Sequence, residues 1–495
     1  MKKIFYMSVF FLFINGIITG QTNPDFPRLE PDPRGVDFAR TGQAREYTWN
    51  ELLDMGLWAS GAAYSRDGAI TGDGAAAKKA VEAAVSSLGA DQNLPLRKQD
   101  QGDYLLNFMH RQFLKTYVER QTRLDLTVTT GRYNCVSSAV LYAILASSVG
   151  LETRGVLTKD HAFAQVNTGD ELVDVETTNR YGYNPGSRKE FQDNFGNTTG
   201  FAYVAPQNYR DRSTISQLEL VSLIMSNRIA DLESRGRFGE AVAVAVDRAA
   251  LLSMRSNPVS SPFFSDPKKD VADRVFNYGA SLIKANKEED ALNWAAAAEP
   301  LYPDPRWREF NFAAMNNLLV KLTQTKKTAD ARIILDREAS RFAPADFGKL
   351  DALVTDAELF QVTTMVSNSE DAEKALEIIS QAAERGLVPE ARIQELRNFV
   401  LLKEAERRSK SSGLKAAMEY LESASGTYGS NQQLQNALRI YNANRAIELH
   451  NQFAGLFNSR KYDEAYRHIQ NALQEYPGDR QLLSDLAAAE RALKQ

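Results

Sequence analysis

Residues 131–139 read GRYNCVSSA, and the single cysteine of the chain, Cys135, lies in the middle of them. An apolar, helix-like run occupies 136–149, and Gly150 ends it. Since Asn134 is a good N-cap residue, we expect Cys135 in the first turn of this helix. The amide groups and the dipole of a first turn favour a thiolate and can hold an oxyanion. The alternative is a small buried hydrophobic side chain, which is the usual state of a free cysteine.

A histidine and a carboxylate further along the chain are predicted to meet on one face of a sheet. His161 begins a predicted β-strand, on which it shares a face with Phe163. A hairpin turn centred on 168–169 should return the chain antiparallel to this strand. In that register Glu176 faces His161, and Asp174 faces Phe163. An imidazole beside a carboxylate can act as a general base of fixed tautomer, and the alternative is a polar cross-strand pair on a solvated face.

Taken together, these residues resemble the transglutaminase-like superfamily, a branch of the papain-like thiol enzymes. The shared pattern is a cysteine at the start of a helix, a His-Ala-aromatic strand, and a later strand that ends in Val-acid-x-Thr. The resemblance is strongest over 132–183, and with flanking helices it extends over about 104–206. It implies an α+β fold for this part of the chain.

The resemblance also implies roles for individual side chains. Cys135 stands in the place of the nucleophile, His161 in that of the general base, and Glu176 in that of the acid that orients the imidazole. Asp174 is the alternative acid, and Phe163 occupies the place of an aromatic residue that is often Trp. Phe163 in place of Trp and Glu176 in place of the family's usual Asp are both departures from the family pattern. Members of the superfamily include peptidases, amidases and amide-crosslinking enzymes, and some have lost activity, so the fold alone does not settle the chemistry.

The start of the chain has the pattern of an export signal. Residues 1–20 contain Lys2 and Lys3, an apolar stretch over 4–18 and a small residue before the polar segment that follows. We therefore expect an exported protein of the periplasm or cell envelope, with no membrane span once the signal is removed. The alternative is an uncleaved anchor. The proline-rich stretch 21–45 is expected to form an extended linker.

Two folded parts are predicted after the linker. Over 46–215 helical spacing gives way to β-like segments, which predicts the α+β domain. The β-like segments are 153–157, 161–166, 172–178 and 201–204. From 216 to 495 the pattern is helical throughout, which predicts an all-α solenoid.

A charged residue followed by alanine recurs through the helical part, which indicates a repeat array. The recurring dipeptides begin at Glu240, Asp290, Asp330, Lys374, Lys415 and Glu464. Two of the units, around 278–303 and 462–477, resemble tetratricopeptide repeats, and the other four are degenerate. Stacked helical pairs form a curved surface that binds a partner, so the repeats are expected to bind a protein or peptide.

Composition excludes several other classes of function. The chain of 495 residues has 59 basic and 63 acidic side chains, so no basic excess points to nucleic acid. One cysteine rules out an intramolecular disulfide and a Cys-x-x-Cys motif. His110, His450 and His468 stand apart from one another, so we expect no metal site and no cofactor. The sequence therefore leaves two hypotheses: an exported thiol enzyme that hydrolyses or transfers peptide amides, or a non-enzymatic envelope adaptor whose repeats bind protein partners.

Overall fold

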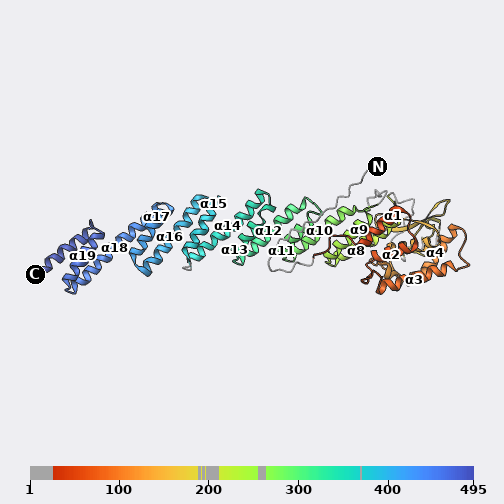
Figure 1. Cartoon of the computed structure of the whole chain (residues 1–495), viewed down its shortest axis with the longest axis horizontal. Helices are drawn as coiled ribbons and strands as arrows, with labels where there is room; N and C mark the ends of the chain where they lie inside the picture. The colour runs from red at the N-terminus through yellow and green to blue at the C-terminus, as the bar shows by residue number, and fades with distance from the viewer. Residues whose placement is uncertain are drawn as a thin grey trace. The chain divides into compact units, whose positions relative to one another are not determined.

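The computed structural model describes residues 26–187, 191, 196, 211–254, 264–367 and 371–494 (Figure 1). The predicted signal at 1–20 and the β-like segment at 201–204 lie outside these residues. The chain forms two compact units, Met1–Phe310 and Asn311–Gln495. The first unit contains the sheet together with the first helices of the predicted repeat region, so it extends well past the boundary expected at 215.

A four-stranded antiparallel sheet forms the β part of the first unit. Its strand order is β5 (Leu172–Val175), β4 (Ala162–Asn167), β3 (Glu152–Leu157) and β6 (Ser213–Ile215). A separate parallel pair, β1 (Thr116–Tyr117) and β2 (Arg132–Tyr133), leads directly into the helix that carries the cysteine.

Helix α6 (Cys135–Ser148) lies at the centre of this unit. It packs on β3 and β4 and also contacts α2 (Trp49–Ala59), α4 (Lys98–Gln112) and α8 (Gln217–Ser234). Nearly every side chain of α6 is buried, as expected for a helix that is apolar on all sides. Helix α8 therefore belongs with the sheet, which explains why the first unit continues beyond 215.

The described part of the first unit contains further helices (Figure 1). They are α1 (Pro33–Ala44), α3 (Gly72–Gly89), α5 (Leu124–Thr130), α9 (Phe238–Leu252), α10 (Pro267–Lys284), α11 (Glu288–Ala298) and the short 3-10 turn at Pro185–Ser187. Of these, α9, α10 and α11 continue the chain from α8. Helix α12 (Arg306–Gln324) runs across the boundary between the two units.

The stretch predicted as an extended linker folds as helix α1 over much of its length. Asp32 caps this helix, and Pro33 occupies its first turn, where a missing N–H costs nothing. The segment before the helix is tied to α9, because Arg28 donates to both carboxylate oxygens of Asp247, at 2.8 and 2.5 Å. The Asp32 amide donates to the same carboxylate at 2.8 Å. The prolines therefore mark a helix start and a packed segment rather than a free linker.

The hairpin between β4 and β5 has a different turn from the predicted one. The Thr168 amide donates to the Glu171 carbonyl at 3.0 Å, so the turn is centred on 169–170 and not on 168–169. Gly169 has φ of +97°, a conformation that glycine adopts readily and a β-branched threonine avoids. The chain therefore places the glycine, and not Thr168, at the first central position of the turn.

This change moves the strand register by two residues. Gln165 lies directly opposite Asp174, where the sequence pattern placed Phe163. Because a shift of two residues keeps every side chain on its own face, His161 and Glu176 still share one side of the sheet. They meet as diagonal neighbours instead of directly opposite partners.

Helices in the predicted repeat region pack on their neighbours in chain order. In the first unit α8 packs on α9, α9 on α10 and α10 on α11. The second unit continues in this way through α13 (Thr328–Glu338), the 3-10 turn Ala339–Arg341, α14 (Pro344–Ser367), α15 (Ala372–Glu384), α16 (Glu390–Ser412), α17 (Leu414–Tyr428), α18 (Gln432–Asn458), α19 (Tyr462–Glu475) and α20 (Arg480–Leu493). Packing of each helix mainly on its sequence neighbours is typical of a helical repeat array.

Each recurring dipeptide lies in the first turn of its helix. The alanine of five of these dipeptides is fully buried, namely Ala241, Ala291, Ala331, Ala375 and Ala465. In α17 the buried residue is Ala417, one position later than the predicted Ala416. Here α17 follows Gly413 directly, and the different turn shifts the buried face by one residue.

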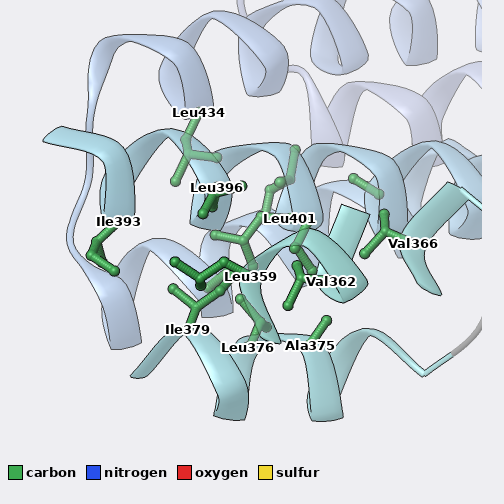
Figure 2. Packing of buried hydrophobic residues seen from close by; sticks show 14 of the residues in the cluster. Leu359, Val362, Val366, Ala375, Leu376, Ile379, Ile393, Leu396, Leu401 and Leu434 are labelled. Atoms are coloured by element: carbon green, nitrogen blue, oxygen red, sulfur yellow. The ribbon is translucent and has the colours of Figure 1, made fainter. Parts of the chain in front are cut away.

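An apolar core of the second unit extends from α14 to α18. Figure 2 shows Leu359 and Val362 of α14 facing Leu376 of α15 and Leu401 of α16, and all four are buried. A smaller cluster around Phe453 joins α18, α19 and α20. Because α18 contributes to both clusters, it connects them.

Four of the turns between helices share one backbone geometry. Each has a residue with φ between +58° and +72°, followed by a basic residue whose amide donates back to a leucine carbonyl of the preceding helix. This is the geometry of a Schellman C-cap. The residues of positive φ are Gly236, Asn286, Lys326 and Arg460.

Replacing a strained residue in this series by glycine should stabilise its turn. Arg460 has φ of +61°, a region that a side chain disfavours, so Arg460→Gly should gain about 0.5–1 kcal/mol locally. The Lys461 amide, which donates to the Leu456 carbonyl at 3.0 Å, should then exchange its hydrogen about two to five times more slowly. Ser459 has φ of −82°, so the control Ser459→Gly should not slow this exchange. Equal slowing in both variants would contradict the explanation.

Candidate active site

Cys135 is the first residue of α6, as the sequence predicts. The Asn134 side chain accepts from the Ser137 amide at 3.0 Å, and the Ser137 hydroxyl accepts from the Asn134 amide at 3.0 Å. This capping box fixes the helix start and leaves the amides of Cys135 and Val136 at its positive end. The Asn134 amide group also donates to the Glu119 carbonyl at 3.0 Å, which holds the neighbouring loop against the cap. Cys135 is partly exposed, so it is not the sealed hydrophobic residue of the alternative interpretation.

His161 lies directly before β4, where a tight turn holds its backbone. The Thr158 amide donates to the His161 carbonyl at 2.9 Å. The imidazole Nε2 lies 2.6 Å from a Glu176 carboxylate oxygen, and the ring also forms a side-chain hydrogen bond with the Cys135 thiol. Only 15% of the His161 side chain and 5% of the Glu176 side chain are exposed. Cysteine, imidazole and carboxylate therefore form one connected set, brought together from α6, the start of β4 and the end of β5.

Glu176 is held on both of its oxygens. One binds His161, and the other accepts from the Thr178 amide at 3.2 Å and the Thr178 hydroxyl at 2.7 Å. The Glu176 amide donates to the Gly182 carbonyl at 2.8 Å, so the backbone is fixed as well. Gly182 packs so closely that a Cβ there would lie 2.0 Å from the Glu176 carbonyl oxygen. The carboxylate is thus oriented before any substrate binds.

The charge state of His161 follows from these neighbours. Burial disfavours the imidazolium, but the Glu176 charge and the hydrogen bonds with Cys135 and Glu176 outweigh it and hold the pKa of His161 well above its ordinary value. An imidazolium next to a thiol favours the thiolate. The arrangement therefore suits a thiolate–imidazolium pair.

Asp174, the alternative acid, has different partners. Both of its oxygens accept from the Arg212 guanidinium, at 2.7 and 2.9 Å, and Gln165 donates to it at 2.9 Å. The Arg212 guanidinium also lies over the Phe163 ring, 5.5 Å from its centroid. Asp174 therefore neutralises an arginine beside the site, while Glu176 contacts the imidazole.

Three further residues, which the sequence pattern did not indicate, position the segment after β5 that carries Glu176. The His110 ring binds the Thr177 carbonyl at 3.0 Å, and the Tyr133 hydroxyl donates to the Thr178 carbonyl at 3.1 Å. Ser138 on α6 bonds to the Thr177 hydroxyl at 2.8 Å. Burial, together with the Glu176 charge, raises the pKa of Tyr133 to about 12, so its hydroxyl stays protonated. Nothing in the sequence spacing indicates these long-range contacts; the adjacency of Tyr133 and Ser138 to Cys135 is the only available signal.

A pocket of about 490 Å³ opens beside the thiol and the imidazole. Its lining includes Cys135, His161 and Tyr117 on one side and residues of α8, among them Leu223 and Asn227, on another. The first helix of the predicted repeat region therefore forms part of the wall of the candidate active site.

In the described ranges, no cluster of three or more His, Cys, Asp or Glu side chains has an arrangement that could hold a metal ion. Among the helices that the structure describes, none combines the length and apolar character needed to cross a bilayer.

No family model matches this chain, and no curated protein sequence matches it. Among solved structures, a monomeric mutant of IFIT1 with Gppp-AAAA aligns with 83% of this chain and 74% of its own, at 14% identity and a TM-score of 0.16. A TM-score this low carries no conclusion about fold or ligand.

Alkylation of the single cysteine should report the thiolate–imidazolium pair. We expect iodoacetamide to modify Cys135 faster in the wild-type chain than in His161→Ala at pH 7, because the neighbouring imidazole assists loss of the thiol proton. Glu176→Gln should give an intermediate rate, since the raised pKa of His161 depends partly on the Glu176 charge. Equal rates for all three proteins would rule out the pair.

His110 should make the first unit sensitive to acid. Burial, aided by the Arg180 charge, lowers the pKa of His110 to about 4, so the unfolded chain binds this proton near pH 6.5 and the folded chain does not. The free energy of unfolding should therefore fall as the pH drops from about 6.5 to 4. His110→Gln should reduce that fall by roughly 2 kcal/mol. Urea unfolding followed by tryptophan fluorescence measures the free energy of unfolding of the first unit, because all four tryptophans of the chain belong to that unit. An equal fall in both proteins would contradict this assignment.

Proposed function

We propose that this chain is an exported thiol enzyme of the transglutaminase-like superfamily that acts on peptide amide bonds. The single observation that carries the proposal is the connected set of Cys135, His161 and Glu176 at the edge of an open pocket. The partial exposure of the thiol favours an enzyme over an adaptor with an inactive site, in which the cysteine would be buried in apolar packing. Export is proposed from the signal pattern at 1–20.

The first half of the reaction forms a thioester. The Cys135 thiolate attacks the amide carbonyl carbon, and the resulting oxyanion is stabilised by the amides of Cys135 and Val136 at the start of α6. The His161 imidazolium then gives its proton to the leaving amine as the C–N bond breaks. The products of this step are a free amine and an acyl group on the Cys135 sulfur.

The second half returns the enzyme to its starting state. His161, now neutral, takes a proton from a water molecule, whose oxygen attacks the thioester carbonyl. The C–S bond breaks, a carboxylic acid leaves, and the thiolate–imidazolium pair is restored. A primary amine in place of water would give a new amide, and the Glu119, Asp160 and Asp231 carboxylates in the pocket lining would attract a cationic one. Hydrolysis is proposed as the main reaction because water needs no binding site of its own.

Glu176 and the helical array have supporting roles in this proposal. Glu176 fixes the tautomer and orientation of His161 and stabilises its charged form, and Thr178 holds the carboxylate in place. The helical pairs, some of which resemble tetratricopeptide repeats, are proposed to bind a protein or peptide partner and bring it to the thiol. Since α8 both starts this array and lines the pocket, binding and catalysis share an element.

Turnover on a pool of synthetic peptides tests the proposal. Mass spectrometry should detect new peptide termini with the wild-type chain and none with Cys135→Ala, because the nucleophile is absent. Glu176→Gln should lower the rate by about 10²–10⁴-fold. Asp174→Asn is the matched control on the same strand and should retain turnover, since Asp174 contacts Arg212 and not the imidazole. Circular dichroism checks that each variant is folded. Product formation by Cys135→Ala would remove the thiol mechanism, and crosslinked peptides instead of new termini would assign amine transfer.

A further inference from the structure

A second pocket of the first unit has six arginines among the fifteen residues of its lining. It measures about 490 Å³ and adjoins the thiol pocket, with which it shares Arg120 and Asp231 in its lining. We call it the arginine pocket. Its lining includes Arg120, Arg123, Arg132, Arg228, Arg235 and Arg237, but only two carboxylates, Asp231 and Glu240.

Three of these arginines already have carboxylate partners. Arg235 pairs with Asp231 at 2.9 Å, and Arg237 pairs with Glu240 at 2.5 Å. Arg123 pairs at 2.5 Å with Asp125, which is almost completely buried. Asp231 and Glu240 are therefore already paired, and neither carboxylate is left to neutralise the other arginines of the lining.

The other three, Arg120, Arg132 and Arg228, have no carboxylate within ion-pair distance in the part of the chain that the structure describes. Arg120 and Arg132 are exposed, and water can solvate them. Arg228 is different, because it is partly buried and its guanidinium lies against the loop that follows α2.

The Arg228 guanidinium contacts the backbone of the loop that follows α2. One guanidinium nitrogen donates to the Ala59 carbonyl at 2.6 Å. Gly61 allows the close approach, since a Cβ there would lie 2.5 Å from another guanidinium nitrogen. Burial and the nearby Arg123 charge lower the pKa of Arg228, while the charges of Asp125, Asp247 and Glu240 oppose this shift. Each of these carboxylates is already paired with another arginine, so an anion in the pocket would supply the direct ionic contact that the Arg228 guanidinium lacks.

We propose that the arginine pocket binds a small ligand with two linked phosphate groups. Guanidinium groups bind phosphate oxygens in pairs, and three arginines without carboxylate partners match a compact ligand of high negative charge. A single carboxylate would neutralise only one of them. The ligand is bound between Arg228 on the inner wall and Arg120 and Arg132 at the opening.

Calorimetric titration of the full chain with inorganic pyrophosphate tests this assignment at fixed ionic strength. One saturable site is expected, with orthophosphate and citrate each binding at least tenfold more weakly. Arg228→Gln should weaken pyrophosphate binding at least tenfold, and Arg120→Gln and Arg132→Gln should each weaken it severalfold. The last two residues are exposed, so these variants remain informative if the Arg228 variant does not fold.

The matched control is Arg154→Gln, which makes the same change in net charge at an exposed arginine on β3, paired with Glu152 outside the pocket. It should bind pyrophosphate as the wild type does. Absence of a saturable site, equal weakening in the Arg154 variant, or equal affinity for citrate would overturn the proposal. None of these readouts depends on turnover at Cys135, so they are independent of the proposed enzyme activity.

Discussion

The burial of α6 on all sides is the constraint on which the first unit depends. This helix carries almost no polar surface, so it is stable only when the sheet covers one side and helices cover the others. Its N-terminus is the one part that reaches the pocket, because the capping box with Asn134 and Ser137 ends the apolar packing there. The same packing therefore buries the helix and leaves Cys135 partly exposed.

The strand that carries Glu176 is positioned from the same helix. Ser138 of α6 bonds to Thr177, while Tyr133 just before the helix bonds to Thr178. A buried carboxylate is costly unless its oxygens are satisfied, and His161 and Thr178 together satisfy both oxygens of Glu176. The Glu side chain is one methylene longer than that of Asp. This extra length helps Glu176 to reach His161, which is its diagonal neighbour and not its direct cross-strand partner. A glutamate at this position is thus compatible with contact to the imidazole.

The helical part follows a different organisation. Each helix packs mainly on its neighbours in sequence, and the turns repeat a left-handed residue followed by a basic one. Local rules are sufficient to form such pairs, which is why alanine spacing alone located their first turns. The first of these helices is an exception, because α8 packs against α6 and β3 and lines both pockets. The array is therefore not simply appended to the sheet but completes the unit that contains the thiol.

The sequence by itself determined the features that depend on short-range physics. These are the cap before Cys135, the alternation that puts His161 and Glu176 on one face, and the buried alanines of the helical pairs. Only the tertiary structure decided the register of the hairpin. Moving the centre of the turn by one residue shifts the pairing of the two strands by two residues. Each side chain then stays on the same face, so the alternation of polar and apolar residues cannot distinguish the two registers. The tertiary structure also decided that 33–44 is a helix bound to the domain, that Asp174 belongs to Arg212, and that distant arginines line one pocket. Each of these depends on contacts between residues far apart in the chain, for which local spacing carries no information.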